Sequence, residues 1–138
     1  MLIRVRKKCI EQSLFDRHIN RFMSEKRYEN FEIGDEYVVF GIVFWSGIPF
    51  YYIYEEDNSD YPVPLCFDFF DVIDPTPSSY WRISVDDASV SGVQTFLVFE
   101  EWAKCKDLYE SLLDGEVNSI EIFNKYRKKI QTEIAMTR

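Results

Sequence analysis

The side chains best suited to acid, base or metal chemistry are few in this chain of 138 residues. It has one histidine, His18, and three cysteines far apart, whereas a metal site needs several Cys or His ligands at close spacing. A serine or cysteine nucleophile would have to use His18 as its base, and Arg17 stands directly before it. We therefore predict no metal site, no cofactor and no histidine-based catalysis.

Carboxylates are abundant, with 24 Asp and Glu residues against 16 Lys and Arg residues. Asp68 and Asp71 are three positions apart and would share one face of a helix, where two carboxylates can do general acid and base work. No glycine-rich phosphate-binding motif occurs in the sequence. A carboxylate-based hydrolase is therefore one alternative, although solvated turns and helix ends explain most of these residues better.

The charges are distributed unevenly along the chain. Residues 30–119 carry 18 acidic and 3 basic residues, whereas the two ends are mildly basic. Such a negative field repels nucleic acid and anionic lipid and attracts basic proteins. The apolar runs are also too short to span a bilayer. We predict a basic protein partner, no nucleic-acid binding and no membrane association; the alternative is that the acidic surface serves solubility alone.

Aromatic residues concentrate in the middle of the chain, beside acidic ones. They are Phe40, Phe44, Trp45, Phe50, Tyr51, Tyr52, Tyr54 and Tyr61. Because successive side chains of a strand face opposite ways, both faces of a hairpin built from this segment would be apolar. One face would line the core, and the other would be covered by another element or offered to a partner. A small-ligand or carbohydrate-binding module that stacks on Trp45 and Tyr52 is a further alternative.

The predicted partner-binding surface combines carboxylates with one aromatic residue from two predicted turns. Its members are Glu55, Glu56, Asp57, Asp60, Tyr61, Asp86 and Asp87. The carboxylates would steer a basic partner towards the surface, and the aromatic ring would add contact area. No catalytic residue is predicted.

The periodicity of the apolar residues predicts an α+β fold in a single domain over residues 1–138. An N-terminal helix precedes a central, mainly antiparallel sheet, and two C-terminal helices follow it. The predicted helices cover 10–26, a segment from Glu100 to a C-cap at Gly115, and a segment that begins near Ser119. The predicted strands cover 37–45, which contains a possible bulge at Gly41, then 50–56, 80–85 and 93–99, whereas 65–73 fits either a strand or a short helix.

The cysteines and the first residues indicate a compartment. Cys9, Cys66 and Cys105 are an odd number of widely spaced thiols, which is not the pattern of a disulfide framework. The first residues include Arg and Lys, but no apolar stretch of signal-peptide length follows them. We therefore predict a reduced, cytoplasmic protein.

The middle of the chain also resembles a known class of proteins. The segments that carry the resemblance are Tyr37-Val-Val-Phe-Gly-Ile-Val-Phe-Trp-Ser-Gly-Ile-Pro-Phe-Tyr-Tyr-Ile-Tyr54, Asp60-Tyr-Pro62, Phe69-Phe70-Asp71, Ile73-Asp74 and Tyr80-Trp81-Arg82. They resemble small bacterial proteins of the immunity-protein kind, which serve toxin systems such as contact-dependent inhibition. The resemblance implies a non-catalytic protein that binds and blocks one cognate toxin, and it assigns no site residue. We expect an acidic immunity protein that occludes a basic toxin, and the oligomeric state stays open.

Overall fold

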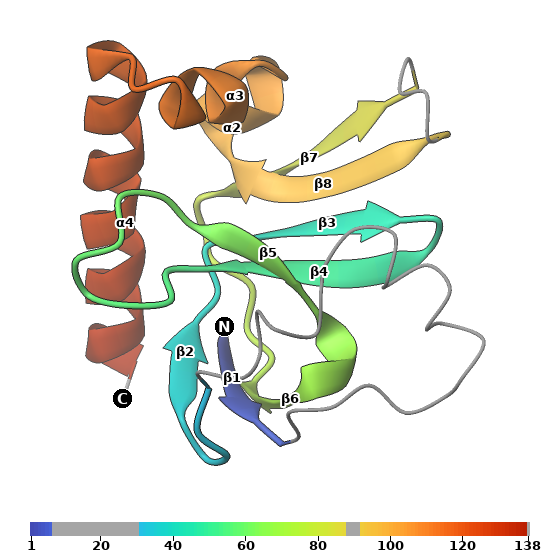
Figure 1. Cartoon of the computed structure of the whole chain (residues 1–138), viewed down its shortest axis with the longest axis vertical. Coiled ribbons are helices and arrows are strands. Elements are labelled where there is room, and N and C mark those ends of the chain that lie inside the picture. The colour runs from blue at the N-terminus through green and yellow to red at the C-terminus, as the bar shows by residue number, and fades with distance from the viewer. Residues whose placement is uncertain (7–30, 88–91, 138) are drawn as a thin grey trace.

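The chain folds into two antiparallel sheets and a group of helices in a computed structural model, which describes residues 1–6, 31–87 and 92–137 (Figure 1). This arrangement confirms the predicted α+β class. The helices lie beside the larger sheet, and the long C-terminal helix runs past both sheets.

The smaller sheet has three strands in the order β2-β1-β6. Its strands are β1 (Leu2–Val5), β2 (Glu36–Val38) and β6 (Phe70–Asp74). The described chain therefore opens with a strand, which the sequence analysis did not predict. The predicted helix over 10–26 lies outside the described residues.

The larger sheet has five strands in the order β5-β4-β3-β8-β7. Its strands are β3 (Gly41–Trp45), β4 (Ile48–Ile53), β5 (Val63–Cys66), β7 (Trp81–Asp86) and β8 (Gln94–Phe99). The predicted hairpin is confirmed, because β3 and β4 pair antiparallel around a tight turn at Ser46 and Gly47, both at positive φ. The predicted strands at 80–85 and 93–99 are confirmed as the paired strands β7 and β8.

The predicted strand over 37–45 is divided between the two sheets. The amide of Val39 donates to the Met1 carbonyl and the amide of Phe40 donates to the Tyr52 carbonyl, so the chain crosses between sheets at these two residues. Gly41 follows and pairs with Tyr52, so Phe40 and Gly41 both oppose this one residue of β4, where the sequence analysis allowed a bulge. A Cβ at Gly41 would lie 3.0 Å from Cγ1 of Val98, so the glycine permits close packing on the neighbouring strand.

The ambiguous segment 65–73 is neither one helix nor one strand. It contains the end of β5, one turn of 3₁₀ helix (Phe67–Phe69) and the start of β6. Phe69 is fully buried in this turn, which carries the chain from the larger sheet to the smaller one. The competing helical and strand patterns reflect this change of direction.

The C-terminal part contains three helices where two were predicted. They are α2 (Glu100–Lys104), α3 (Leu108–Leu113) and α4 (Val117–Thr137). The predicted helix from Glu100 breaks at 105–107, because Cys105 adopts extended backbone. The predicted C-cap at Gly115 is confirmed: its amide donates to Leu112 and the next amide donates to Ser111, which closes α3 with the glycine at φ +80°.

An aromatic cluster joins the helices to the larger sheet. The Phe99 and Tyr126 rings stack with centroids 4.1 Å apart, and Trp102 packs against Tyr52 and Phe123 at 4.7 and 5.0 Å. All five side chains are buried. The apolar stripe of α4 is formed by Phe123, Tyr126, Ile130 and Ile134, which are buried.

Candidate functional site

The loop 54–62 connects β4 to β5 and lies beside α4 (Figure 1). It contains five of the seven residues predicted for the partner-binding surface, namely Glu55, Glu56, Asp57, Asp60 and Tyr61. Pro62 and Pro64 mark its return to the sheet. The sequence prediction of a polar, acidic loop at this place is therefore consistent with the structure.

Arg127 of α4 holds this loop through backbone carbonyls. Its guanidinium donates to the carbonyls of Ser59 and Asp57 at 3.1 Å each, and to the Glu56 carbonyl at 3.5 Å. The guanidinium carbon also lies 3.8 Å from the centre of the Tyr54 ring, a cation–π contact. Burial raises the pKa of Tyr54 to about 12, and Arg127 opposes part of that rise.

A second anchor holds the other end of the loop. The Tyr109 hydroxyl of α3 donates to the Pro62 carbonyl at 2.6 Å. Between the anchors, Ser59 closes a local turn by accepting from the Glu56 amide at 3.0 Å. None of these contacts that fix the loop backbone involves an acidic side chain.

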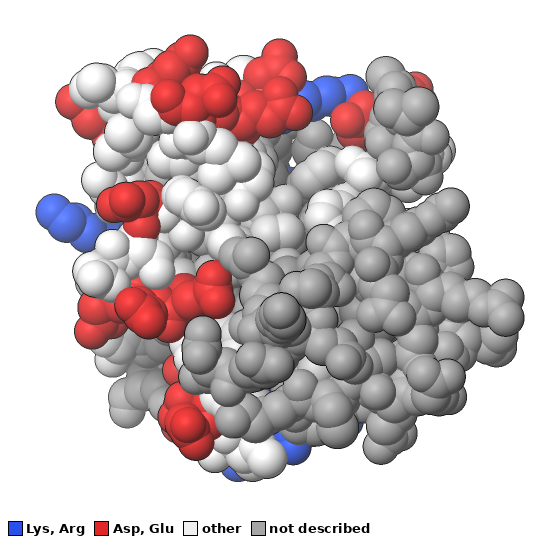
Figure 2. Space-filling view, in the orientation of Figure 1, with Lys and Arg blue, Asp and Glu red and all other residues white. Residues whose placement is uncertain are grey.

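The loop carboxylates consequently face outward. Glu56, Asp57 and Asp60 are exposed, and in the described part of the chain no Lys or Arg side chain forms an ion pair with them. Figure 2 shows acidic side chains gathered over this loop, with a second group over α2 and α3. The exposed acidic residues of α3 and its two ends are Asp107, Glu110, Asp114 and Glu116. This face therefore presents a concentrated negative charge.

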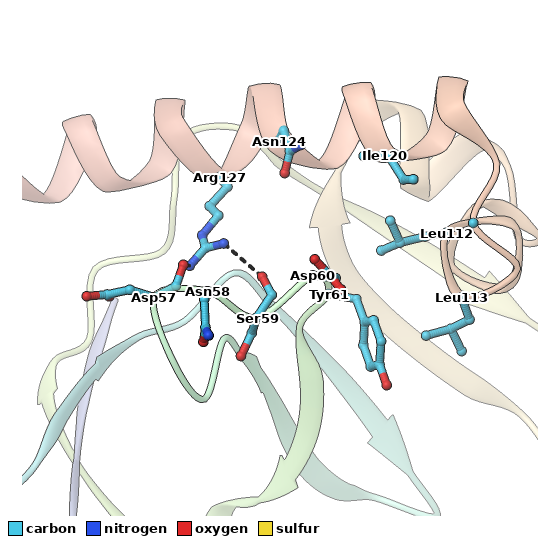
Figure 3. A pocket seen from close by; sticks show the side chains of 11 residues that line it. Asp57, Asn58, Ser59, Asp60, Tyr61, Leu112, Leu113, Ile120, Asn124 and Arg127 are labelled. Carbon is cyan, nitrogen blue, oxygen red and sulfur yellow. Dashed lines mark hydrogen bonds between the residues drawn. The ribbon is translucent and has the colours of Figure 1, made fainter.

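A groove of about 520 Å³ lies between the loop, the end of α3 and α4, and we call it the acidic groove (Figure 3). Its lining residues are Asp57, Asn58, Ser59, Asp60, Tyr61, Leu112, Leu113, Gly115, Ile120, Asn124 and Arg127. Leu113 and Tyr61 are 48% and 42% exposed, so apolar surface is accessible at the rim. The groove thus offers both carboxylates and apolar contact area.

The hollow surface continues along α4. A second depression of about 420 Å³ and a third of about 210 Å³ share Asp57 and Arg127 with the acidic groove. The third also reaches Glu36 and Glu55. A bound segment longer than one side chain could therefore follow the loop past several carboxylates.

Asp86 and Asp87 lie away from this groove. Asp86 ends β7 opposite Gln94, and Gln94 pairs with Trp45 at the far end of β3, whereas the loop 54–62 leaves the sheet near Gly41. Asp86 is also ion-paired with Lys106 at 3.4 Å. The seven predicted residues therefore divide into two separate regions at opposite ends of the larger sheet.

The aromatic stretch is mainly core. Phe40, Phe50, Tyr51, Tyr52 and Tyr54 are buried, whereas Tyr61 is exposed. Tyr52 is only 3% exposed, so its ring cannot stack on a ligand together with Trp45. Trp45 is half-buried and its ring lies 4.5 Å from the Phe50 ring. The two-ring carbohydrate platform does not form.

The candidate hydrolase pair is held by an arginine. Arg6 donates to Oδ1 of Asp68 at 3.1 Å and to Oδ1 of Asp71 at 3.4 Å, and also to the Asp68 carbonyl at 2.9 Å. These contacts fix the turn between β5 and β6 against β1. They give the two carboxylates a structural role in joining the strands.

The sequence analysis did not identify the residues that α3 and α4 contribute to the groove. These are Leu112, Leu113, Ile120, Asn124 and Arg127. Arg127 follows buried Tyr126 on the apolar stripe of α4, and a cation at the border of such a stripe is the one signal for it. Its target, the loop backbone, lies about 70 positions earlier and could not be inferred from spacing.

Neither a metal-binding cluster nor a membrane-spanning helix occurs in the described ranges. No group of three or more His, Cys, Asp or Glu side chains there converges as ligands around a metal ion would. No helix there combines the length and the apolar composition that a membrane crossing requires. In comparisons with known proteins, no family model, curated protein or solved structure matches this chain.

Proposed function

We propose that this protein is a non-catalytic binding protein that engages a basic protein partner at the acidic groove. The observation that carries the proposal is the way Arg127 binds the loop. The guanidinium uses the carbonyls of Glu56, Asp57 and Ser59, so it fixes the loop without pairing with its carboxylates. A cation that only served to neutralise the loop would be expected to contact the carboxylates themselves.

The groove suits a partner that presents lysine or arginine. Such a side chain has an apolar stem and a charged head, and the stem can pack on Leu113 and Tyr61 while the head reaches Asp57 or Asp60. The exposed carboxylates of α3 add long-range attraction, which raises the association rate at low salt. The arrangement therefore favours fast, salt-sensitive recognition.

The class of partner that we propose is a bacterial toxin. The resemblance to immunity proteins supports this choice, and the acidic surface fits toxins that act on nucleic acid, since these carry basic active sites. Inhibition would be steric and electrostatic: the loop carboxylates would occupy the place of the substrate phosphates. No chemical step by this chain is required.

The proposed compartment is the cytoplasm. Cys66 is buried and Cys105 is exposed, and neither of these two forms a disulfide bond. An exposed free thiol is compatible with a reducing environment, in which disulfides do not form readily. The protein would meet its toxin after the toxin enters or is made in the same cell.

The experiment that tests the proposal compares two triple charge reversals during co-purification from the native host. Glu56, Asp57 and Asp60 are replaced by Lys in one variant. Glu32, Asp35 and Asp87, which line neither the acidic groove nor the two depressions beside it, are replaced in a control variant with the same change in net charge. We expect the wild type and the control to retain one basic protein at low salt and to release it at raised salt. The groove variant should retain none.

Activity of the captured protein then tests the toxin class. Its expression should arrest growth, and the wild-type chain, but not the groove variant, should restore growth. Equal capture by both variants would place the partner elsewhere on the surface. If the captured protein is harmless to the cell, the proposed toxin class is wrong and only the proposed binding function stands.

A further inference from the structure

The two edges of the larger sheet are protected differently. The sheet ends at β5 on one side and at β7 on the other. The β5 edge carries Pro64, which has no backbone amide to offer to another strand. The β7 edge, Trp81–Asp86, contains no proline, and within the described residues no strand pairs with its outer side. Its outward-facing backbone groups are therefore available for pairing.

The side chains of β7 are unusual for an open edge. Ile83 and Val85 are 71% and 51% exposed and share one face of the strand. Arg82, Ser84 and Asp86 share the opposite face. Proteins commonly protect an open edge with charged or proline residues, because an exposed apolar strand invites pairing with another chain. The exposed Ile83 and Val85 provide no such protection.

The order of residues along β7 is self-complementary. A two-fold axis perpendicular to the sheet pairs residues that share a face, so an antiparallel pair of β7 strands must be centred on a residue. Centring on Ser84 places Arg82 opposite the Asp86 position of the second strand, and Ile83 opposite its Val85 position. Centring on Ile83 or Val85 instead brings no Arg82 position opposite an Asp86 position.

We infer that β7 pairs with β7 of a second copy of this chain, in antiparallel register centred on Ser84. The pairing joins two five-stranded sheets into one continuous sheet. The two-fold symmetry produces two Ile83–Val85 contacts on one face and two Arg82–Asp86 ion pairs on the other. Apolar contact and opposite charge thus favour the same register.

The neighbours of the two charged residues are compatible with this register. Arg82 is exposed, and its Nη1 donates to the carbonyls of Ser79 and Trp81, which leaves other donors of the guanidinium for a carboxylate. Asp86 contacts Lys106 at 3.4 Å through Oδ1, and a carboxylate can accept from two cations. The contacts of Arg82 with the two carbonyls and the contact of Asp86 with Lys106 do not have to break when two β7 strands pair. The inference uses no residue of the acidic groove and stands independently of the proposed function.

The test is the solution mass of the full-length chain, measured by sedimentation or light scattering over a concentration series. The wild type should change from its monomer mass of 16.5 kDa to twice that value as concentration rises. Arg82→Glu would place like charges opposite each other twice, and we expect it to weaken self-association about tenfold or more. Asp86→Arg should do the same for the same reason.

Mixing the two single variants tests the register directly. In a mixed pair, the two substituted residues face each other with opposite charges, and the unchanged Asp86 of one chain faces the unchanged Arg82 of the other. Both ion pairs therefore form again, one of them with reversed sign. We expect the mixture of the Arg82→Glu and Asp86→Arg chains to form dimers that neither variant forms alone. The double variant Arg82→Glu/Asp86→Arg should likewise recover self-association.

Lys128→Glu on α4 is the matched control, since Lys128 is exposed, lies outside β7 and its replacement changes the net charge as Arg82→Glu does. It should dimerise like the wild type. A wild type that stays monomeric over the whole series would overturn the inference, as would a dimer that Arg82→Glu leaves unchanged. Failure of the two single variants to associate on mixing would refute the Ser84-centred register.

Discussion

The β5 edge and the β7 edge of the larger sheet show two ways to treat an open strand. The β5 edge, which we call the closed edge, carries Pro64, and the loop 54–62 that leads into β5 is fixed through its carbonyls by Arg127 and Tyr109. At β7, no described strand pairs with the outer side, and Ile83 and Val85 remain exposed. The first edge presents charge, and the second presents backbone and apolar side chains.

This difference separates two kinds of recognition. Carboxylates on a fixed loop attract a partner over distance, and salt weakens that attraction. An open strand makes short-range backbone hydrogen bonds and apolar contacts, which depend little on salt. We therefore expect salt to release a partner from the acidic groove under conditions that leave pairing at β7 largely intact.

The largest expected loss of stability comes from truncating Trp102, whose side chain supports both edges of the larger sheet. Trp102 is buried and packs on Tyr52 of β4 and on Phe123 of α4. Trp102→Ala should lower the free energy of unfolding by about 3–5 kcal/mol, because it leaves a large cavity. Urea unfolding followed by circular dichroism measures the loss, and hydrogen exchange should accelerate at both edges.

Trp45→Ala is the matched control for that substitution. Trp45 is only half-buried, whereas Trp102 is buried, so removing the Trp45 side chain should cost clearly less unfolding free energy. Equal losses for the two tryptophans would contradict the central position given to Trp102.

The next largest loss of stability should affect the β5 edge and leave the β7 edge unchanged. Arg127→Ala removes the hydrogen bonds to the loop and the cation–π contact with Tyr54, and we expect a loss of about 2 kcal/mol of unfolding free energy. Hydrogen exchange should accelerate in the loop and in β5 but not in β7 and β8. Lys128→Ala, the neighbouring exposed cation, should change neither measurement. Faster exchange in β7 would show that the edges are coupled.

A smaller effect depends on pH and concerns the closed edge alone. Burial raises the pKa of Tyr54 from 10.0 to about 12, whereas Arg127 favours the ionised form. The unfolded chain therefore loses this proton first, and the stability that Tyr54 contributes is fully present below pH 10 and is lost as the pH rises towards about 12. Tyr54→Phe keeps the ring and should reduce this alkaline loss, measured as unfolding free energy across that range. An unchanged slope would assign the loss to other tyrosines.

Part of the fold could be predicted because it rests on local patterns. The β3–β4 hairpin follows from apolar strands around the Ser46-Gly47 turn, and the end of α3 follows from Gly115. The break at 105–107 could not be predicted, since Cys105 lies on the same apolar stripe as Trp102 and Leu112. There the chain leaves helical geometry in the middle of an uninterrupted helical pattern.

The candidate site was predictable to the same extent. The acidic loop could be identified from its composition, whereas its anchor Arg127 could not, because the contact joins residues far apart in sequence. Asp86 does not lie beside the loop with which the sequence analysis grouped it, since the strand register places Asp86 at the opposite end of the sheet. Composition indicates which charges exist, and only the pairing of strands decides which of them share a surface.

The smallest expected effect on stability lies at the β7 edge. Ile83 is 71% exposed, so Ile83→Thr should change the unfolding free energy of the monomer by no more than about 0.5 kcal/mol. The measurement is urea unfolding at a concentration where the protein is monomeric. Val43→Thr, on buried strand β3, should cost far more because it buries an added hydroxyl. A large loss for Ile83→Thr would mean that this side chain is covered in the monomer, and β7 would then be as closed as β5.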